Sequence, residues 1–382
     1  MSFDFTSLPD RRGTGSLKWD KYAGRDILPM WVADMDFLSP PCVRDALARR
    51  VAHGVFGYTV PTREAAAAVR GWLRDRHEAE AEAEQIVWFP GLVPCLNVIC
   101  RALGTDGDEV IALTPVYPPF LSAPAFSHRA SVSVPLALDG DRWSVDMARL
   151  EAAFTPRTRA LLFCNPHNPV GRVFTEAEVR AVAALCARRG ALFCSDEIHA
   201  DLVLGPSRHF SALRLSDAEA GERIVLMAPS KTFNTPGLSC AFAVIPEANL
   251  RQRIRDAARG IITEINAMGY AACEAAFREG EPWRQELLSV LRGNREVLYD
   301  FVARETPAIR LRPMEATYLA WLDCRALGLD DPASFFEKGG VGLSDGKLFG
   351  PGGEGFLRFN FGCPRTRVEE ALRRMKAALA RR

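Results

Sequence analysis

The sequence predicts an α/β protein with a large domain, built on a mostly parallel sheet with helices on both faces, plus a smaller α/β C-terminal domain. Two observations favour this fold class. The 382 residues, of which 48% are hydrophobic and 25% charged, suit an ordinary globular chain of roughly two to three domains. From about residue 86 to 250, short runs of β-branched and apolar residues alternate with longer segments of helical period, which is typical of α/β units around a parallel sheet.

Local patterns predict the elements in order. The candidate strands of the large domain are residues 109–114, 160–164, 191–195, 223–228 and 240–245. Between them, Thr175 and Glu178 form a capping box at the start of a helix, and Gly190 follows its last turn.

The C-terminal third shows a second α/β pattern. A long helix over residues 264–305 is broken near Gly280, and strands at 317–322 and 356–361 precede an amphipathic helix at 368–380. We therefore expect an N-terminal segment, residues 1–42, that packs with the small domain, a large cofactor-binding domain, residues 43–275, and a small domain, residues 276–382.

The composition argues against several classes of function. The 48 Lys and Arg residues balance 47 Asp and Glu residues, so no global charge favours nucleic acid or an anionic membrane. No apolar run approaches the ~18 residues of a spanning helix, and the start of the chain lacks the features of a signal peptide. The ten cysteines are scattered without a C-x-x-C pair, as in a reducing compartment. We expect a cytoplasmic protein that binds neither nucleic acid nor a membrane.

One lysine is a candidate catalytic residue. Lysine occurs only at positions 18, 21, 231, 338, 347 and 376, so arginine carries nearly all the positive charge. A general preference for arginine explains this scarcity, but it does not explain why Lys231 persists alone between residues 22 and 337. Arginine stays protonated in proteins, whereas a lysine amine can act as a nucleophile, form a Schiff base and transfer protons.

Chemically useful groups follow the predicted strands, at the sheet edge where ligands bind in parallel sheets. Upstream, Gly91, Leu92 and Val93 open a helix whose free N–H groups and dipole favour a phosphate. The groups that follow successive strands are those of Tyr117, of Asn168, of Asp196 with His199, and of Ser230 with Lys231.

Each group also has a simpler interpretation. Taken alone, Asn168 would be a turn residue and Tyr117 an aromatic at a rim. Asp196, with the neighbouring Glu197, His199 and Asp201, could form a metal site. However, no zinc-type histidine spacing is present, and adjacent carboxylates at a strand end point in opposite directions.

Together these groups fit pyridoxal 5′-phosphate, which requires a lysine amine, a carboxylate, an amide donor, a stacking ring and a phosphate cradle. Lys231 would form the Schiff base and then exchange the α-proton, while Asp196 would keep the pyridine nitrogen protonated. Asn168 and His199 would hydrogen-bond the phenolic oxygen, and Tyr117 would stack on the ring. Ser230 and the amides of residues 91–93 would hold the phosphate.

Motifs along the whole chain resemble one known family. They are RRGTGSLKWD at 11–20, PMWVADMDF at 29–37, FGYT at 56–59, NPHNP at 165–169, SDEIH at 195–199, SKTFN at 230–234, TYLAWLD at 317–323 and RFNFGCPR at 358–365. With them the sequence resembles the MalY/PatB-type cystathionine β-lyase (C-S lyase) group, fold-type I pyridoxal phosphate enzymes of the class I/II aminotransferase superfamily. The first motif and D-E-I-H distinguish this group from ordinary aminotransferases, which usually carry tyrosine at the His199 position.

The resemblance implies an enzyme that acts on a small amino acid. The implied reaction is β-elimination from cystathionine or another cysteine S-conjugate, which gives a thiol, ammonia and pyruvate. The implied catalytic residues are Lys231, Asp196 and Tyr117, and Arg358 is the implied clamp for the substrate carboxylate. Tyr58 would reach the cofactor phosphate and the substrate in the neighbouring subunit of a homodimer.

Two alternatives remain open. An aminotransferase of small amino acids uses the same residues, and the fold could also serve a regulatory protein that merely binds the cofactor. The chain departs from the family pattern at Ser239, where many aminotransferases have a phosphate-binding arginine, and at Gly15 and Thr235. These departures concern substrate specificity rather than the cofactor.

Overall fold

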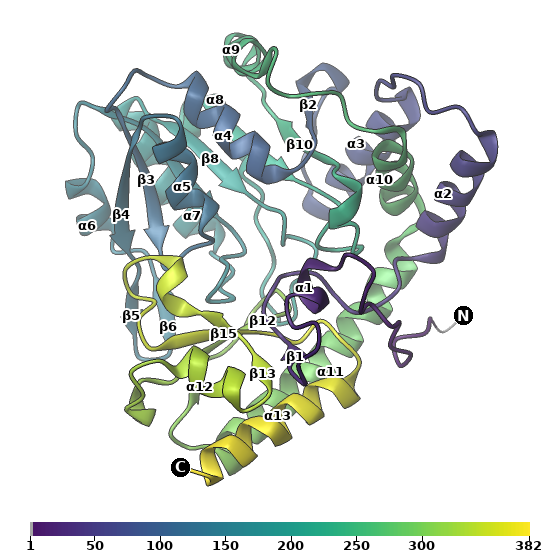
Figure 1. Cartoon of the computed structure of the whole chain (residues 1–382). Coiled ribbons are helices and arrows are strands. Elements are labelled where there is room, and N and C mark those ends of the chain that lie inside the picture. The colour runs from purple at the N-terminus through teal and green to yellow at the C-terminus, as the bar shows by residue number, and fades with distance from the viewer. Residues whose placement is uncertain (1–2) are drawn as a thin grey trace.

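The computed structural model of the protein describes residues 3–382 and contains two α/β parts, one above the other in Figure 1. The upper part contains a seven-stranded sheet in the order β2-β10-β9-β8-β7-β3-β4. Its strands are β2 Ile86–Phe89, β3 Glu109–Thr114, β4 Ala130–Pro135, β7 Thr158–Cys164, β8 Leu192–Asp196, β9 Arg223–Met227 and β10 Ala241–Val244.

The predicted mostly parallel sheet is confirmed, with one reversed strand. Neighbours from β9 to β4 pair in parallel, whereas β10 is antiparallel to both β9 and β2. The five predicted strands are all present to within two residues at each end. The sequence analysis did not identify β2 or β4, which lie at the two edges of the sheet.

Helices cover both faces of this sheet because its strands bury side chains on both sides. In β3, Ile111 and Leu113 belong to the apolar cluster that includes residues of α3, α7 and α10, while Val110 and Ala112 belong to the cluster that includes residues of α4, α5 and α9. The helices of the upper part are α2 Pro41–His53, α3 Arg63–His77, α4 Leu92–Ala102, α5 Pro119–Phe126, α6 Met147–Ala152, α7 Glu176–Arg189, α8 Asp217–Ala220, α9 Ala248–Ala258 and α10 Ala267–Glu279. A short hairpin, β5 Ala137–Asp139 with β6 Arg142–Ser144, extends from it.

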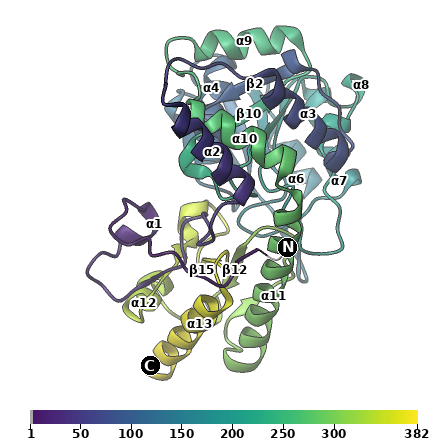
Figure 2. The ribbon, with the colours of Figure 1, turned by 90° about the vertical axis from the view of Figure 1, so that its right-hand side faces the viewer.

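The lower part is built on a four-stranded antiparallel sheet in the order β11-β12-β15-β14. Its strands are β11 Arg310–Leu311, β12 Leu319–Asp323, β14 Ser344–Asp345 and β15 Phe356–Asn360. Its helices are α11 Glu281–Glu305, α12 Pro332–Lys338 and α13 Arg365–Ala380, of which α11 and α13 lie side by side in Figure 2.

The N-terminal segment packs against this lower part. After α1 Leu17–Asp20, strand β1 Leu28–Pro29 pairs in parallel with β13 Val341–Gly342. The first and last parts of the chain therefore form one layer, with α1 beside the lower domain in Figure 2.

Two predicted helix boundaries have clear physical causes. The Thr175 hydroxyl accepts from the Glu178 N–H, the Glu178 carboxylate accepts from the Thr175 N–H, and Gly190 ends α7 with φ 66°. Between α10 and α11, a Cβ on Gly280 would lie 2.5 Å from Cε1 of Phe233, so only glycine fits.

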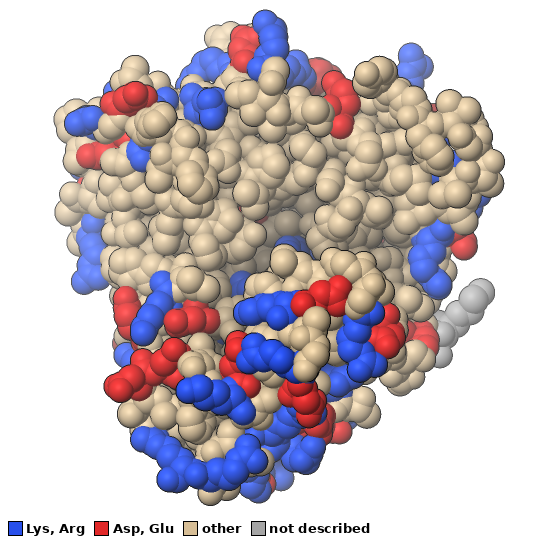
Figure 3. Space-filling model, viewed as in Figure 1, with Lys and Arg blue, Asp and Glu red and all other residues tan. Residues whose placement is uncertain are grey.

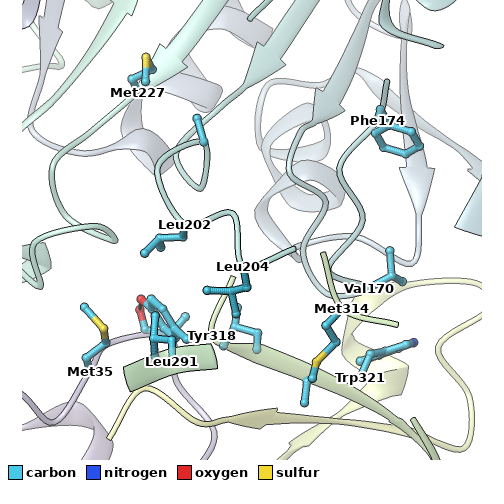
Figure 4. Packing of buried hydrophobic residues seen from close by; sticks show 14 of the residues in the cluster. Met35, Val170, Phe174, Leu202, Leu204, Met227, Leu291, Met314, Tyr318 and Trp321 are labelled. Carbon is cyan, nitrogen blue, oxygen red and sulfur yellow. Dashed lines mark hydrogen bonds between the residues drawn. The ribbon is translucent and has the colours of Figure 1, made fainter. Parts of the chain in front are cut away.

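The two parts share a continuous apolar core. Figure 4 shows Leu202 and Leu204, from the loop after β8, between Met227 above and Tyr318 below. We propose the boundaries 1–42, 43–275 and 276–382 for the segment and the two domains. Two helices run across these boundaries, since α2 begins at Pro41 and α10 continues to Glu279, and the break at Gly280 follows.

The structure also bears on the state of the cysteines and on membrane-spanning helices. The ten cysteines are free thiols, and all except Cys42 are buried. Among residues 3–382, no helix combines the length and apolar character needed to cross a bilayer.

Candidate active site

A cavity of about 250 Å³ lies where the carboxyl ends of the parallel strands meet strand β15. Figure 3 shows the surface hollowed at this junction of the two domains. Every predicted site residue except Tyr58 lines the cavity, namely Gly91, Leu92, Val93, Tyr117, Asn168, Asp196, His199, Ser230, Lys231 and Arg358. The structure thus brings the groups that follow the strand ends to one cavity.

Lys231 enters the cavity from the loop after β9. The fully buried Phe233 anchors this loop, and the buried Thr232 hydroxyl donates to Asp201 Oδ2 over 3.4 Å. The Lys231 Nζ donates to the Ala33 carbonyl oxygen at 2.6 Å. Burial and the nearby Arg358 guanidinium lower the pKa of Lys231 to about 8. An amine with this pKa is well suited to exchange protons near neutral pH.

Asp196 is the last residue of β8 and is only 4% exposed. Its Oδ1 accepts from the Ile198 N–H at 3.0 Å, and burial raises the pKa of the carboxyl to about 7. A buried carboxylate is stabilised by a positive partner. A protonated pyridine nitrogen in the cavity would be such a partner.

His199 also faces the cavity as a neutral ring. Burial lowers its pKa to about 3, and its buried Nδ1 has no hydrogen-bond partner within residues 3–382. A buried polar atom of this kind fits an additional ligand atom.

The other acidic residues after β8 turn away from the cavity. Glu197 Oε2 lies 2.9 Å from His209 Nε2, and Asp201 Oδ1 lies 3.0 Å from His77 Nε2. Asp196 is therefore the single carboxylate among the residues that line the cavity. In the described part of the chain, no three His, Cys, Asp or Glu side chains are grouped to hold a metal ion.

Arg358, on β15, brings a cation from the small domain. Its Nη1 donates to Asn168 Oδ1 at 3.1 Å and its Nη2 donates to the Trp31 carbonyl at 3.0 Å. The guanidinium carbon lies 4.9 Å from the centroid of the Phe349 ring. Burial lowers the pKa of Arg358 to about 10, so the group remains charged at neutral pH and suits a carboxylate.

The opposite end of the cavity is formed by the start of α4. Gly91 has φ 134°, a conformation that favours glycine, and the N–H groups of the first helical turn have no partner inside the helix. Ser230 and Ser239 line the cavity as well. This end offers the donors that a phosphate requires.

Tyr58 lies outside the cavity of its own chain. It is fully exposed, on the loop between α2 and α3, and its neighbours Val55, Phe56 and Val60 are more than half exposed. Tyr58 therefore does not lie in a buried turn of its own chain.

The sequence analysis missed the part of the wall formed by Val32 and Ala33. The motif at 29–37 predicts no role for these two residues, because the contact to Lys231 comes from a main-chain carbonyl. It also missed Tyr318, whose hydroxyl donates to the same Ala33 carbonyl at 3.1 Å.

Comparisons with known proteins agree with this geometry. Residues 25–375 match the family described as Aminotransferase class I and II. The chain is 38% identical to cystathionine β-lyase PatB of Bacillus subtilis, over 100% of both chains. An aspartate aminotransferase of Geobacillus stearothermophilus is 26% identical over 86% of this chain.

Solved structures are similar over the whole chain. OvoB is 43% identical with a TM-score of 0.95, and 99% of each chain is covered. Cystalysin from Treponema denticola, whose structure contains pyridoxal 5′-phosphate, is 33% identical with a TM-score of 0.96 and full coverage of both chains.

Proposed function

Because the chain belongs to the aminotransferase class I and II family, we propose that it is a pyridoxal-phosphate-dependent carbon–sulfur β-lyase. Its substrate is cystathionine or another cysteine S-conjugate, and its products are a thiol, ammonia and pyruvate. The observation that carries the proposal is the 38% identity, over the full length of both chains, to a cystathionine β-lyase. The aminotransferase relative is more distant, at 26% identity.

The cavity suits the cofactor in three places. Lys231 supplies the amine for its aldehyde, Asp196 the anion for its ring nitrogen, and the start of α4 the N–H donors for its phosphate. Asn168, His199 and Tyr117 also line the cavity, where the two polar groups would hydrogen-bond the phenolic oxygen and the tyrosine would stack on the ring. When bound, pyridoxal phosphate withdraws electrons from the substrate Cα and so makes the α-proton removable.

The chain's own groups then direct the reaction. Arg358 binds the α-carboxylate through its two parallel N–H donors and so fixes the Cα–H bond relative to Lys231. The free Lys231 amine accepts the α-proton at Nζ, and its pKa of about 8 leaves part of it unprotonated at neutral pH. The Cβ–S bond breaks with its electron pair on sulfur, so a thiolate leaves. Water then completes the conversion of the remaining three carbons to pyruvate and ammonia.

We expect purified protein, supplied with pyridoxal phosphate and S-methyl cysteine alone, to release pyruvate and methanethiol in equal amounts. A β-lyase needs no second substrate, whereas an aminotransferase needs a 2-oxo acid to complete its cycle. Pyruvate is measured with a coupled dehydrogenase and the thiol with a chromogenic disulfide. Alanine, which lacks a β-leaving group, is the matched control. Turnover that appears only after a 2-oxo acid is added would contradict lyase function.

We also propose a homodimer with shared active sites, located in the cytoplasm. The free, buried thiols support the location. An exposed apolar stretch that includes Val55, Phe56, Tyr58 and Val60 supports the dimer, since such patches mark interfaces. The middle of the upper domain's face in Figure 3 also carries few charged side chains. In this dimer Tyr58 donates to the phosphate bound in the other subunit.

Mixing two inactive homodimers, Tyr58→Ala and Lys231→Ala, is expected to restore activity when subunits exchange. If Tyr58 serves the other subunit, each mixed dimer has one site with both defects and one site with neither. Activity is measured as pyruvate release, and exchange is verified by mass spectrometry of differently tagged chains. Mixing Asp196→Asn with Lys231→Ala is the control, because both residues belong to the same site and no intact site forms. Verified exchange without recovery would mean that Tyr58 acts within its own subunit or that its role is structural.

A further inference from the structure

The segment from Trp31 to Met35 is bound through its main chain in an unusual way. Each of its five consecutive carbonyl oxygens accepts a hydrogen bond from a side chain. In order, the donors are Arg358 with Ser344 for Trp31, Asn360 for Val32, Lys231 with Tyr318 for Ala33, Asn360 with Lys18 for Asp34, and Asn234 with Arg11 for Met35. We call residues 31–35 the carbonyl segment.

Two asparagines hold the carbonyl segment from opposite sides. Asn234, three positions after Lys231, donates to Met35 O at 2.9 Å and to Phe37 O at 2.8 Å, and it accepts from Met35 N at 2.9 Å. Asn360, two positions after Arg358, donates to the carbonyls of Val32 and Asp34 at 2.6 and 2.7 Å. One asparagine thus ties the segment to the lysine loop and the other ties it to β15.

The N-terminal motif at 11–20 anchors the same segment. Lys18 Nζ and Asp36 Oδ2 lie 2.8 Å apart, and both side chains are only 1% exposed. Asp36 Oδ1 also accepts from Arg11 and from the Trp19 indole. Removing one partner of a buried ion pair is strongly destabilising, so this anchor resists displacement.

We infer that the carbonyl segment is a template that sets the spacing between the Lys231 amine and the Arg358 guanidinium, and that Asn234 and Asn360 are its positioning residues. The Ala33 carbonyl receives the Lys231 amine when that amine is free, which is the form that exchanges the α-proton. The inference deepens the proposed function and rests on it, since the Lys231 amine would take the proton from the substrate Cα while Arg358 holds the carboxylate attached to that carbon. It also depends on contacts within the chain that exist without any ligand.

The pKa of the Lys231 amine depends on the same packing of the carbonyl segment. Burial and Arg358 lower the pKa of Lys231, while Asp34 and Asp196 oppose the shift. The neighbouring His199 is neutral because burial lowers its own pKa. If the carbonyl segment loosens, water enters and Arg358 moves relative to the amine, so the pKa of Lys231 returns toward the ~10.4 of a solvated lysine.

Three matched variants test the template. Asn234→Gly removes the first clamp and suits the φ of 55° at this position, and Asn360→Ala removes the second. Asn294→Ala is the control, because Asn294 is also buried and also donates to two carbonyls, those of Phe361 and Cys363, which do not line the cavity. A fourth variant, Tyr318→Phe, keeps the ring and removes only the second donor to the Ala33 carbonyl.

The decisive measurement needs no turnover. The full chain, stripped of cofactor, is labelled with acetic anhydride across a range of pH, and the labelled peptides are quantified by mass spectrometry. The exposed Lys347 serves as an internal reference. We expect Lys231 to titrate near pH 8 in wild type and in Asn294→Ala, and about one unit or more higher in Asn234→Gly and Asn360→Ala. Tyr318→Phe should shift it in the same direction by less.

Kinetics on the loaded enzyme provide the second measurement. We expect kcat for pyruvate release to fall by about tenfold or more in Asn234→Gly and Asn360→Ala, because small misplacements of catalytic groups are costly. KM should rise most in Asn360→Ala, which lies beside the carboxylate clamp. An unchanged Lys231 titration in the variants that fold, or an equal shift in Asn294→Ala, would overturn the template. If wild type releases no pyruvate from any cysteine conjugate, the proposed function fails, and the labelling result still decides the template.

Discussion

Lys231→Ala is expected to abolish pyruvate release while the protein remains folded. The lysine supplies both the amine that binds the cofactor and the base for the α-proton, and no other lysine lines the cavity. Its side chain makes one hydrogen bond, to the Ala33 carbonyl, so its removal costs little packing. Turnover is measured with a cysteine conjugate, and folding is measured by circular dichroism.

Lys347→Ala, at an exposed position, is the matched control and should keep full activity. A direct check is borohydride reduction of the yellow protein, followed by peptide mapping. The label should be found on Lys231 alone. A label on another lysine, or near-normal rates in Lys231→Ala, would refute the assignment.

Asp196→Asn is expected to change activity and stability in opposite directions. An amide at position 196 would no longer keep the pyridine nitrogen of the cofactor protonated. Turnover should therefore fall by about a hundredfold or more, which is typical for the loss of such an electrostatic group. In the chain stripped of cofactor, however, burial raises the pKa of Asp196 from 3.8 to about 7. An ionised Asp196 therefore destabilises the folded state, whereas a neutral amide at this position does not.

The direction in which the stability of the wild type changes with pH follows from proton linkage. Because the folded-state pKa lies above the unfolded one, wild type loses stability relative to Asp196→Asn as pH rises from about 4 to about 7. At pH 8 the stripped variant should unfold several degrees above stripped wild type, and at pH 4 the two should be similar. Thermal unfolding by calorimetry at both pH values measures this difference. A variant that is less stable by the same amount at both pH values would contradict it.

The strands and helices that the sequence predicted are those whose pattern is local. The capping box at Thr175 depends on neighbouring residues, and the break at Gly280 is marked by the proline that follows two positions later, so both could be predicted from the sequence. The edge strand β4 buries few side chains and gives a weaker pattern, and this strand was missed. The reversal of β10 is decided by its pairing partners, which lie far away in the sequence.

The site was predictable wherever a side chain carries the chemistry. Lys231, Asp196 and Asn168 were identified from residue type and position and Arg358 from the family resemblance, and the structure brings all four into one cavity. Ala33 was not identifiable in this way, because any residue offers the same carbonyl oxygen. Its position depends on contacts to Lys231 and Tyr318, more than 190 residues away in the sequence.

The pairing of β1 with β13 has a consequence for the order in which the protein is made. Val341 follows Leu28 by 313 positions, so at ~5–20 residues per second the partner strand is synthesised roughly 15 to 60 seconds later. During that time Met30, Met35 and Phe37, which are buried in the finished protein, have no C-terminal surface to cover them. A chain released before β13 therefore carries Lys231 but cannot complete the wall of its cavity, and it presents this apolar stretch to chaperones and proteases.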